Sequence, residues 1–561
     1  MVLKIAARQS DLARLQAFEV GKALKNAYSE AGFEGQLEIQ YQFRSSLGDQ
    51  RADDPLWQMP EKGVFTEDFV ADLRSGAADM VVHSWKDLPI QEREGTVIAA
   101  TLKRADARDV LLVRRDLWEE RVKSRSAGGA PFRVLTSSPR RVYNLAPFLK
   151  WALPWPASQG SNAQSPEVEF VPVRGNIATR VRKLVEPEDA KPDGLIVAKA
   201  ALDRLLTSDQ YGPPFDESVR SLRAALSKTM FMVLPLSVNP TAAAQGALAI
   251  EVRSDRLDIL ELCRKIDVAT DRACVEEERA ELAKHGGGCH QKIGVTILNR
   301  PYGRVRFIRG LTDAGLVLNT VQAGEKRRFV WPKAQTEDEV FVSRISEEAR
   351  EAVPEAISFL NARLQSLVNG RMGFFVARSE AWQPACEKIL NEGRQGGADH
   401  VVWTAGLATW RKLAACGVWV HGTTESLGED ESPDLETLAG EKVLWTRLTH
   451  EAAAVGRDEA VGMYRVRLEV EQELEKSGAA KFFFWKSGLL FREALKARPE
   501  LSLAYHATGP GQTAKTVAAA LLAAAVQRGL DPKQAEEEVA ERHAIVLNED
   551  EFKKLVFEKR M

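Results

Sequence analysis

Residues 78–89 read Ala78-Asp79-Met80-Val81-Val82-His83-Ser84-Trp85-Lys86-Asp87-Leu88-Pro89, an apolar run followed at once by polar and charged side chains. The run 78–82 has the length of a buried strand, and Pro89 ends any helix that begins after it. Ligands of open α/β sheets bind at the carboxyl ends of strands, where Lys86 and Asp87 fall. A carboxylate among cations stays charged, so Asp87 is a candidate to stabilise a developing cation. The alternative is a turn held by a structural salt bridge.

The same order of apolar run and polar junction recurs along residues 1–260. The expected strands are Val2–Ala6, Leu37–Phe43, Ala78–Val82, Val110–Val113, Val134–Leu135, Phe170–Val173, Gly194–Val197 and Leu248–Val252. Helical patterns lie between them, such as those that begin at Asp11 and cover Phe65–Arg74. Strands that alternate with helices are typical of α/β architecture with mostly parallel sheets.

The pattern changes at Ala269. One charged helix is expected over Asp271–His285 and a final one over Glu347–Leu367. Between them, hairpin-like strands are expected around Val295, over Val305–Ile308 and over Leu316–Ala323. This order predicts a small α+β unit. The glycine-containing stretch 369–373 is the expected joint to a second α/β unit.

Composition narrows the classes of function. The 561 residues favour about three to five domains. The formal net charge of −2 argues against a general nucleic-acid binder, which carries a net basic surface. The longest apolar run, Val517–Val526, is too short to cross a bilayer, and the first residues lack the apolar segment of a signal peptide. We therefore expect a soluble, monomeric, cytoplasmic protein whose partners include neither nucleic acid nor membrane.

The cysteines point to one loop. The chain has 5 cysteines and no CxxC pair, so neither a disulfide framework nor a zinc ribbon is indicated, and we expect no metal site. Cys289 follows three glycines within residues 286–291, which leaves room for a bulky group on its sulfur. The alternative is a loop with an ordinary free thiol, since most cysteines are inert.

Three further strand ends carry hydroxyls and arginines, at residues 6–10, 135–141 and 173–180. Ser10 and Ser138 are natural N-caps for the helices that follow. Capping does not explain the accompanying arginines. Arginine forks match carboxylate geometry, so junctions that converge on one crevice would form a pocket for a polycarboxylate. The alternative at each junction alone is a capped helix with solvated arginines.

Seven stretches occur in an order typical of one known family. They are Ala7–Ala13, Lys62–Phe65, His83–Pro89, Thr136–Arg141, Arg174–Asn176, Ala243–Leu248 and Gly287–Cys289. Up to about residue 365, the chain resembles hydroxymethylbilane synthase, also called porphobilinogen deaminase. The resemblance implies a transferase of haem biosynthesis that deaminates porphobilinogen and polymerises it into the linear tetrapyrrole hydroxymethylbilane.

The resemblance also implies roles for individual residues. Cys289 would carry a dipyrromethane primer through a thioether, and Asp87 would stabilise positive charge as ammonia leaves the substrate. Side chains implied to hold the carboxylates of the cofactor are Ser84, Lys86, Thr136, Ser138, Arg140, Arg141 and Gln245. Those implied to bind the substrate are Arg8, Ser10, Lys62, Arg174, Arg180 and Arg204, with Lys62 in a flexible loop beside the cleft.

The family's fold gives an expected division of the chain. Two periplasmic-binding-protein-like α/β lobes would comprise residues 1–103 with 245–265 and residues 104–244. A small α+β domain over 266–367 would carry the cofactor cysteine.

A few positions depart from the family pattern. Leu135 and Ala178 stand where the family usually has glycine, as does Ala244 within an Ala-Ala-Gln-Gly stretch. His290 and Lys292 replace commoner residues after the cysteine. Added methyl groups near a backbone-lined pocket would narrow it. No charged catalytic position is lost, so these departures are expected to tune the site.

Residues 373–561 are expected to form a Rossmann-like α/β unit. Its strand ends at 401–406 and 482–488, and the stretch 506–514, combine serine or threonine with glycine, which suits docking of carboxylates on backbone amides. These stretches resemble uroporphyrinogen-III synthase, which cyclises the linear product to uroporphyrinogen III. The unit is shorter than that two-domain enzyme. The alternative is a non-catalytic structural appendage.

A different hypothesis for the whole chain is a non-enzymatic carboxylate-binding module. Two α/β lobes with hydroxyls and arginines in a cleft also describe periplasmic binding proteins. Such a module needs neither Asp87 nor Cys289. A dipyrromethane adduct on the purified protein would decide for the enzyme.

Overall fold

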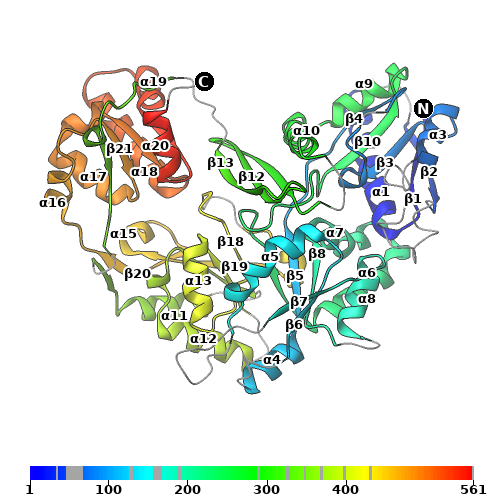
Figure 1. Ribbon diagram of the computed structural model, residues 1–561, viewed down its shortest axis with the longest axis horizontal. Helices are drawn as coiled ribbons and strands as arrows, with labels where there is room; N and C mark the ends of the chain where they lie inside the picture. Colours follow the sequence, from blue (N-terminus) through cyan, green and yellow to red (C-terminus); the bar gives the residue numbers. More distant parts are fainter. Residues whose placement is uncertain are drawn as a thin grey trace. The chain divides into compact units, whose positions relative to one another are not determined.

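The computed structural model divides the chain into two compact units (Figure 1). It describes residues 1–32, 36–45, 67–91, 93–124, 130–155, 167–187, 191–286, 291–323, 329–346, 349–366, 371–395, 400–428 and 433–558. The first unit consists of Met1–Asn299 and Arg306–Val321, and the second of Arg300–Val305 and Gln322–Met561. Among the described residues, no helix is long and apolar enough to span a membrane.

The first unit begins with a five-stranded sheet in the order β2-β1-β3-β10-β4. Its strands are β1 (Val2–Arg8), β2 (Glu38–Arg44), β3 (Met80–Ser84), β4 (Thr96–Ala100) and β10 (Leu248–Arg253). β1 pairs in parallel with β2 and β3, whereas β10 runs antiparallel to β3 and β4. Side chains of β1 alternate between the two faces. Ile5 packs with α1 (Asp11–Glu30), and Ala6 packs on the other face with Phe69 of α3 (Glu67–Ser75).

A second five-stranded sheet repeats this arrangement, in the order β7-β6-β8-β5-β9. Its strands are β5 (Asp109–Arg114), β6 (Phe132–Leu135), β7 (Val168–Val171), β8 (Gly194–Ala198) and β9 (Thr229–Val233). Its helices include α4 (Arg115–Ser124), α5 (Pro139–Ala152), α6 (Ile177–Val185), α7 (Lys199–Leu206) and α8 (Asp216–Leu226). β6 is parallel to β7 and β8, and β5 is antiparallel to β8 and β9. The chain crosses between the two sheets in residues 101–108 and 234–247. The expected α/β class is confirmed, but the sheets are not mostly parallel, because two of the four strand pairings in each are antiparallel.

A smaller sheet of consecutive strands follows α10 (Ala269–Ala283). Its strands are β11 (Gly294–Arg300), β12 (Gly303–Leu311) and β13 (Val317–Ala323), each beside the next. Burial alternates along much of β12, which is typical of a strand with one face in the core. This is the helix and hairpin-like strands expected after Ala269.

The second unit contains two largely parallel sheets. The first has the order β14-β21-β22-β23, and all its pairs are parallel. The second has the order β15-β20-β19-β16-β17-β18, with β15 antiparallel to β20 and the other pairs parallel. The strands are β14 (Val340–Val342), β15 (Arg350–Ala352), β16 (Arg371–Val376), β17 (Val401–Thr404), β18 (Gly422–Thr423), β19 (Val443–His450), β20 (Ala460–Val466), β21 (Phe482–Trp485), β22 (Tyr505–Thr508) and β23 (His543–Ile545).

Aromatic residues of β21 fill both faces of the four-stranded sheet. Phe483 and Trp485 pack in one cluster with α17 (Gly488–Ala497) and α18 (Gln512–Gln527), while Phe484 packs in another with α20 (Glu549–Phe557). A continuous apolar strand is what a parallel sheet covered on both faces requires.

The division into units differs from the expected boundary near residues 367–373. β14 and β15 fall within the range 266–367, yet they pair with β21 and β20. Phe341 of β14 lies with its ring centroid 5.7 Å from that of Phe483, so the strand is held by the core of the second unit.

The helix expected over Glu347–Leu367 is shorter in the structure. It begins at Ala356 as α11 (Ala356–Ser366), after the extended β15. Pro354 explains the late start, because the residue before a proline disfavours helical backbone.

Candidate active site

Lys86 and Asp87 lie on a single helical turn, η2 (Trp85–Asp87), directly after β3. The turn is fixed by Trp85, which is buried and whose amide donates to the Ala247 carbonyl at 3.1 Å. This anchoring leaves Asp87 exposed and Lys86 half-buried. The strand end thus presents a carboxylate beside an ammonium group, as the sequence predicts.

Gln245 connects this turn to the second sheet. Its Oε1 accepts a hydrogen bond from Lys86 Nζ at 3.3 Å. Its Nε2 donates to the Ala107 carbonyl at 2.7 Å and to Asp109 Oδ1 at 2.8 Å. Burial lowers the pKa of Lys86, and the neighbouring Asp87 carboxylate opposes that shift. Because its amide is already bonded on both sides, Gln245 positions Lys86.

Asp109, the first residue of β5, is a fully buried carboxylate that gathers side-chain donors. Its Oδ1 accepts from Arg141 Nη2 at 2.7 Å, in addition to Gln245. Its Oδ2 accepts from Arg141 Nε at 3.0 Å and Arg140 Nη2 at 3.1 Å. Asn239 Nδ2 adds a bond to Oδ2 at 2.9 Å. No motif in the sequence singled out this residue, although an acid at the start of an apolar strand is a signal for a buried partner.

The charges of Asp109, Arg140 and Arg141 influence one another strongly. Burial alone would raise the pKa of Asp109, but the guanidinium groups of Arg141 and Arg140 hold it well below its ordinary value. Burial lowers the pKa of Arg140. Arg140 Nη1 also donates to the Pro240 carbonyl at 2.7 Å, and Arg141 Nη1 to the Ile196 carbonyl at 3.0 Å. Both arginines are therefore buried and held by partners within the protein.

Arg174 and Arg180 belong to the third strand-end junction. Asn176 caps α6, and Arg180 Nε donates to the Gly175 carbonyl at 2.7 Å. Gly175 has a φ of +105°, and a Cβ there would lie 2.7 Å from the Thr179 side chain. Only glycine suits this turn, which holds the two arginines on either side of it.

The electrostatic neighbours of Arg180 show which charges approach one another. Burial lowers the pKa of Arg180, Arg141 and Arg174 lower it further, and Asp87 opposes them. Arg141 likewise lowers the pKa of Lys86. The charges of Lys86 and Asp87 are therefore close enough to those of Arg140, Arg141 and Arg180 to influence them. Cations outnumber carboxylates in this set of residues.

Hydroxyl groups line the start of α5. Ser137 Oγ donates to the Val173 carbonyl at 2.7 Å and accepts from the Val173 amide at 2.9 Å, which ties the end of β6 to the residue before Arg174. Thr136 is buried, and its Oγ1 accepts from the Ser138 amide at 3.3 Å. Ser138 occupies the N-cap position, as predicted, but its side chain makes no capping hydrogen bond. The helix therefore does not use the Ser138 hydroxyl.

Arg204 lies in an ion pair between α7 and α1. Its Nε is 3.1 and 3.2 Å from the carboxylate oxygens of Glu19, and its Nη2 donates to the Gly246 carbonyl at 3.2 Å. The sequence predicts a substrate carboxylate as its partner, whereas here the partner is Glu19.

Ser10, Ser84 and Arg8 lie at the ends of β1 and β3. Ser10 caps α1 and accepts from the Ala13 amide at 3.4 Å. Ser84 Oγ accepts from Gln16 Nε2 at 3.3 Å. Both hydroxyls are therefore tied to α1, and Arg8 is half-buried at the end of its strand.

Glu278 of α10 is a second buried carboxylate that the sequence reasoning missed. Its oxygens pair with Arg104 Nη1 at 2.6 Å and Nη2 at 3.0 Å. They also accept from the Ala244 amide at 2.7 Å and the Ile297 amide at 2.6 Å. Arg104 and Ala244 lie on the two crossings between the sheets, and Ile297 lies on β11. One carboxylate thus fastens both crossings to the small sheet.

Two expected residues, Lys62 and Cys289, lie outside the described residues. Gly286 and Gln291, which flank residues 287–290 in the sequence, are described. Gln291 is buried, and its Nε2 donates to the His285 carbonyl. Within the described part of the chain, no group of three or more His, Cys, Asp or Glu side chains is suited to hold a metal ion.

Comparison with known proteins assigns the first unit. Residues 3–261 match a family model described as porphobilinogen deaminase, dipyromethane cofactor binding domain. A porphobilinogen deaminase of Acidothermus cellulolyticus is 33% identical over 359 residues, which cover 59% of this chain and 92% of that protein. One of Syntrophomonas wolfei is 31% identical over 311 residues, which cover 55% of this chain and 84% of that protein. The chain belongs to the porphobilinogen deaminase family.

Membership of the porphobilinogen deaminase family fixes the class of chemistry. The family comprises transferases of porphyrin biosynthesis, and the matched domain is the one that binds dipyrromethane as its cofactor. The match ends at residue 261, before Cys289 and the second unit.

Solved structures give only weak likenesses. YhfZ from Shigella flexneri is 14% identical with a TM-score of 0.22, over 50% of this chain and 90% of that chain. A TRAP periplasmic solute binding protein from Ochrobactrum anthropi is 11% identical with a TM-score of 0.23, over 50% of this chain and 79% of that chain. The fold assignment rests on the sheets described above.

Proposed function

We propose that this chain is a hydroxymethylbilane synthase, which deaminates porphobilinogen and joins the units into a linear tetrapyrrole on a dipyrromethane attached to Cys289. The observation that carries the proposal is the exposed carboxylate of Asp87 at a strand end among Lys86 and the arginines of the second sheet. A cytoplasmic location and a monomeric state complete the proposal.

The cationic cluster suits the cofactor and the substrate, because both carry acetate and propionate side chains. Guanidinium and ammonium groups bind such carboxylates with charge-assisted hydrogen bonds. We assign the cofactor to Ser84, Lys86, Thr136, Ser138, Arg140, Arg141 and Gln245, and the substrate to Arg8, Ser10, Lys62, Arg174, Arg180 and Arg204.

Some of these residues act through a neighbour. Arg140 is bonded to Asp109, and Gln245 bridges Asp109 and Lys86. Their buried bonds support a positioning role, in which they fix Lys86 and the pair of Asp109 and Arg141.

Asp87 is the group proposed to act on the reacting ring. When the C–N bond of porphobilinogen breaks and ammonia leaves, positive charge develops on the substrate's pyrrole. A carboxylate held beside that ring lowers the energy of this charge and accepts a hydrogen bond from the pyrrole N–H. When bound, the dipyrromethane supplies the pyrrole carbon to which the first substrate ring is joined. Lys86 lies beside Asp87 on the same helical turn.

The intact mass of the purified chain tests the assignment of the cofactor. A dipyrromethane adduct is expected on the wild type and not on Cys289→Ala. Cys416→Ala is the matched control, because Cys416 is an exposed free cysteine in the second unit. An adduct that persists in Cys289→Ala would place the tether elsewhere, and its absence from the wild type would favour a non-enzymatic carboxylate-binding module.

A second activity is proposed for the second unit: cyclisation of hydroxymethylbilane to uroporphyrinogen III. The observation that favours it is the approach of loops from the carboxyl ends of the two sheets. A Cβ on Gly428, after β18, would lie 3.9 Å from the backbone of Gly511, which caps α18 after β22. Arg457 Nη2 donates to Gln512 Oε1 across the same junction. Strand ends followed by helix N-termini suit carboxylates.

Backbone strain in the same region supports this second proposal. Glu425 and Ser426 have φ values of 55° and 61°, in the left-handed region. Such residues are costly and cluster at sites that bind ligands. Thr424 Oγ1 donates to the Ala405 carbonyl at 2.9 Å and holds this loop against the end of β17.

Product analysis separates the two activities. The full chain given porphobilinogen should yield the type III isomer, because a linked unit meets the product at an effective concentration of about millimolar. The Cys289→Ala chain given hydroxymethylbilane should still yield type III, whereas buffer alone yields type I. If both proteins give type I alone, the second unit is a structural appendage.

A further inference from the structure

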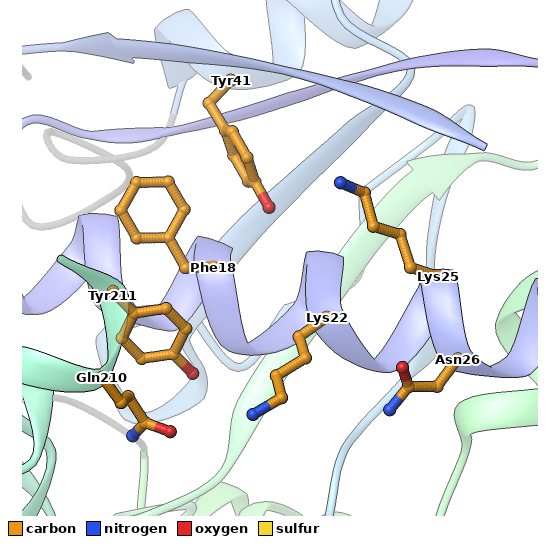
Figure 2. A pocket seen from close by; sticks show the side chains of 7 residues that line it. All are labelled: Phe18, Lys22, Lys25, Asn26, Tyr41, Gln210 and Tyr211. Carbon is orange, nitrogen blue, oxygen red and sulfur yellow. The ribbon is translucent and has the colours of Figure 1, made fainter. Parts of the chain in front are cut away.

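A pocket of about 350 Å³ lies in the first unit between α1, β2 and η3 (Ser208–Tyr211) (Figure 2). None of its lining side chains belongs to the candidate active site. α1 and β2 belong to the first sheet's lobe, and η3 follows α7 of the second. The pocket is therefore distinct from the candidate active site, and the side chains that line it indicate which ligand it suits.

Aromatic rings form one wall of the pocket. The rings of Phe18 and Tyr41 meet edge to face with centroids 4.6 Å apart, and those of Phe18 and Tyr211 stack at 5.7 Å. Figure 2 shows the Tyr41 hydroxyl directed toward α1 and the Tyr211 hydroxyl directed toward the side on which Lys22 lies. The perpendicular and stacked rings form an apolar wall that carries two phenol hydroxyls, which suits an aromatic ligand with polar substituents.

Gly21 makes room for one of these hydroxyls. A Cβ on Gly21 would lie 2.0 Å from Tyr41 Oη. Glycine in a helix interior costs about 1 kcal/mol relative to alanine. At this position on α1, glycine lets the tyrosine tip lie against the helix beside the pocket.

Two ammonium groups supply positive charge. Lys22 and Lys25 are exposed on α1, and neither lies within ion-pair distance of a carboxylate of the described residues. Figure 2 shows Lys25 extending toward Tyr41 and Lys22 toward the Tyr211 end of the pocket. The carboxylate of Glu19 is neutralised by Arg204, so the pocket is left with a net positive charge.

The tyrosine hydroxyls remain donors at neutral pH. Burial raises the pKa of Tyr41 to about 12, with the charge of Tyr211 acting in the same direction. Burial and Glu19 raise the pKa of Tyr211 as well, against Arg204. Each end of the pocket thus combines an ammonium group with a neutral phenol.

We propose that this pocket binds a small aromatic dicarboxylate, with its ring against Phe18 and one carboxylate at each lysine. Such a ligand bridges α1 of the first lobe and η3 of the second. The site is distinct from Asp87 and does not depend on the proposed catalytic role of that residue.

Calorimetric titration of the full-length chain with isophthalate, a benzene ring with two carboxylates, tests this proposal. Isophthalate should bind, and benzamide, which lacks carboxylates, should bind at least about tenfold more weakly. The double variant Lys22→Gln/Lys25→Gln should weaken isophthalate by about tenfold, because two charge pairs are lost.

Two control variants locate the binding. Lys123→Gln removes a lysine on α4 whose side chain is 80% exposed. Arg174→Gln removes a cation of the candidate active site. Both should leave the dissociation constant of isophthalate unchanged. If Arg174→Gln abolishes binding, or the lysine double variant keeps the wild-type dissociation constant, or the wild type shows no binding at about 10 mM, the proposed site is wrong.

Gly21→Ala gives an independent check that leaves both lysines in place. Its methyl group displaces the Tyr41 hydroxyl, so isophthalate should bind more weakly while the circular dichroism spectrum stays unchanged. Unaltered binding to a folded Gly21→Ala protein would contradict the arrangement proposed for the pocket.

Discussion

Two pairs of arginines in the second lobe look alike in the sequence but lie in different surroundings. Arg140 and Arg141 are 4% and 8% exposed and are bonded to the buried Asp109. Arg174 and Arg180 are half-buried, and Arg180 is bonded to a carbonyl of its own turn. The difference teaches that similar strand-end junctions can hold arginines either buried against a carboxylate or half-buried at a turn.

The largest effect on stability is expected from Asp109→Ala. It leaves two buried guanidinium groups without their carboxylate, which should lower the unfolding free energy by about 3–5 kcal/mol. Guanidinium unfolding followed by tryptophan fluorescence measures this loss. Asp116→Ala is the matched control, because Asp116 pairs with Arg114 but is 63% exposed, and it should cost less than about 1 kcal/mol. Equal losses of unfolding free energy in the two variants would mean that burial does not set the contribution of Asp109.

Asp87→Asn should lower turnover strongly and leave the unfolding free energy almost unchanged. Turnover of porphobilinogen should fall by about 10²–10³-fold, because an amide cannot stabilise the cation on the substrate. The unfolding free energy should change by less than about 0.5 kcal/mol, since Asp87 is exposed. Steady-state kinetics and intact mass, which should still show the adduct, test both parts. Near-normal turnover would remove Asp87 from the proposed chemistry.

The contribution of Asp109 to the unfolding free energy should decrease at acidic pH. Its pKa is lowered in the folded chain, so below about pH 4 the unfolded chain binds a proton that the folded chain does not. The stability that Asp109 provides is fully present above that pH and is lost as the pH falls. The gap between wild type and Asp109→Ala should shrink by up to about 1.4 kcal/mol per pH unit below pH 4. Unfolding curves at pH 7, 5, 4 and 3 would show a constant gap if the coupling is absent.

Arg141→Gln and Arg180→Gln should differ in their effect on the unfolding free energy, because the first arginine is bonded to a buried carboxylate and the second is half-buried. Arg141→Gln should cost about 1–3 kcal/mol, because bonds to a buried carboxylate are lost. Arg180→Gln should stay within about 0.5 kcal/mol of the wild type and should instead accumulate partly extended chains visible by intact mass. If Arg180→Gln is the more destabilising variant, the two pairs have been assigned in reverse.

The smallest effect is expected from Ala244→Gly. Ala244 has a φ of 69°, which costs a non-glycine residue about 1–2 kcal/mol, and glycine would relieve this strain. The lost methyl is fully buried, and removing it costs about 0.8 kcal/mol. The two effects nearly cancel, so the unfolding free energy should change by less than about 1 kcal/mol. A larger stabilisation would mean that the crossing at Ala244 is more strained than its φ indicates.

The strand ends could be predicted from the sequence because their signals are local. An apolar run before Asp87 and a glycine after Arg174 are visible within a few residues. The partners of Asp109 could not be predicted, since Asn239 and Gln245 come from a distant crossing. Lys62 and Cys289 stay predictions, as does every catalytic role.

In the second unit, too, pairings between distant parts of the chain could not be predicted from the sequence. Its α/β character follows from its apolar runs, but β14 pairs with β21 at a separation that no local pattern reveals. The ion pair of Arg204 with Glu19 likewise joins two helices far apart in the chain. Long-range pairing, rather than propensity, decides these features.

The hydrogen bonds of Glu278 restrict how the two lobes can move. Because its carboxylate holds Arg104, Ala244 and Ile297 together, the lobes cannot swing about their two crossings without pulling on α10. α10 leads within a few residues to Gly286 and the stretch that contains Cys289. Any rotation of the lobes about these crossings would therefore also displace α10 and the small sheet that begins with β11.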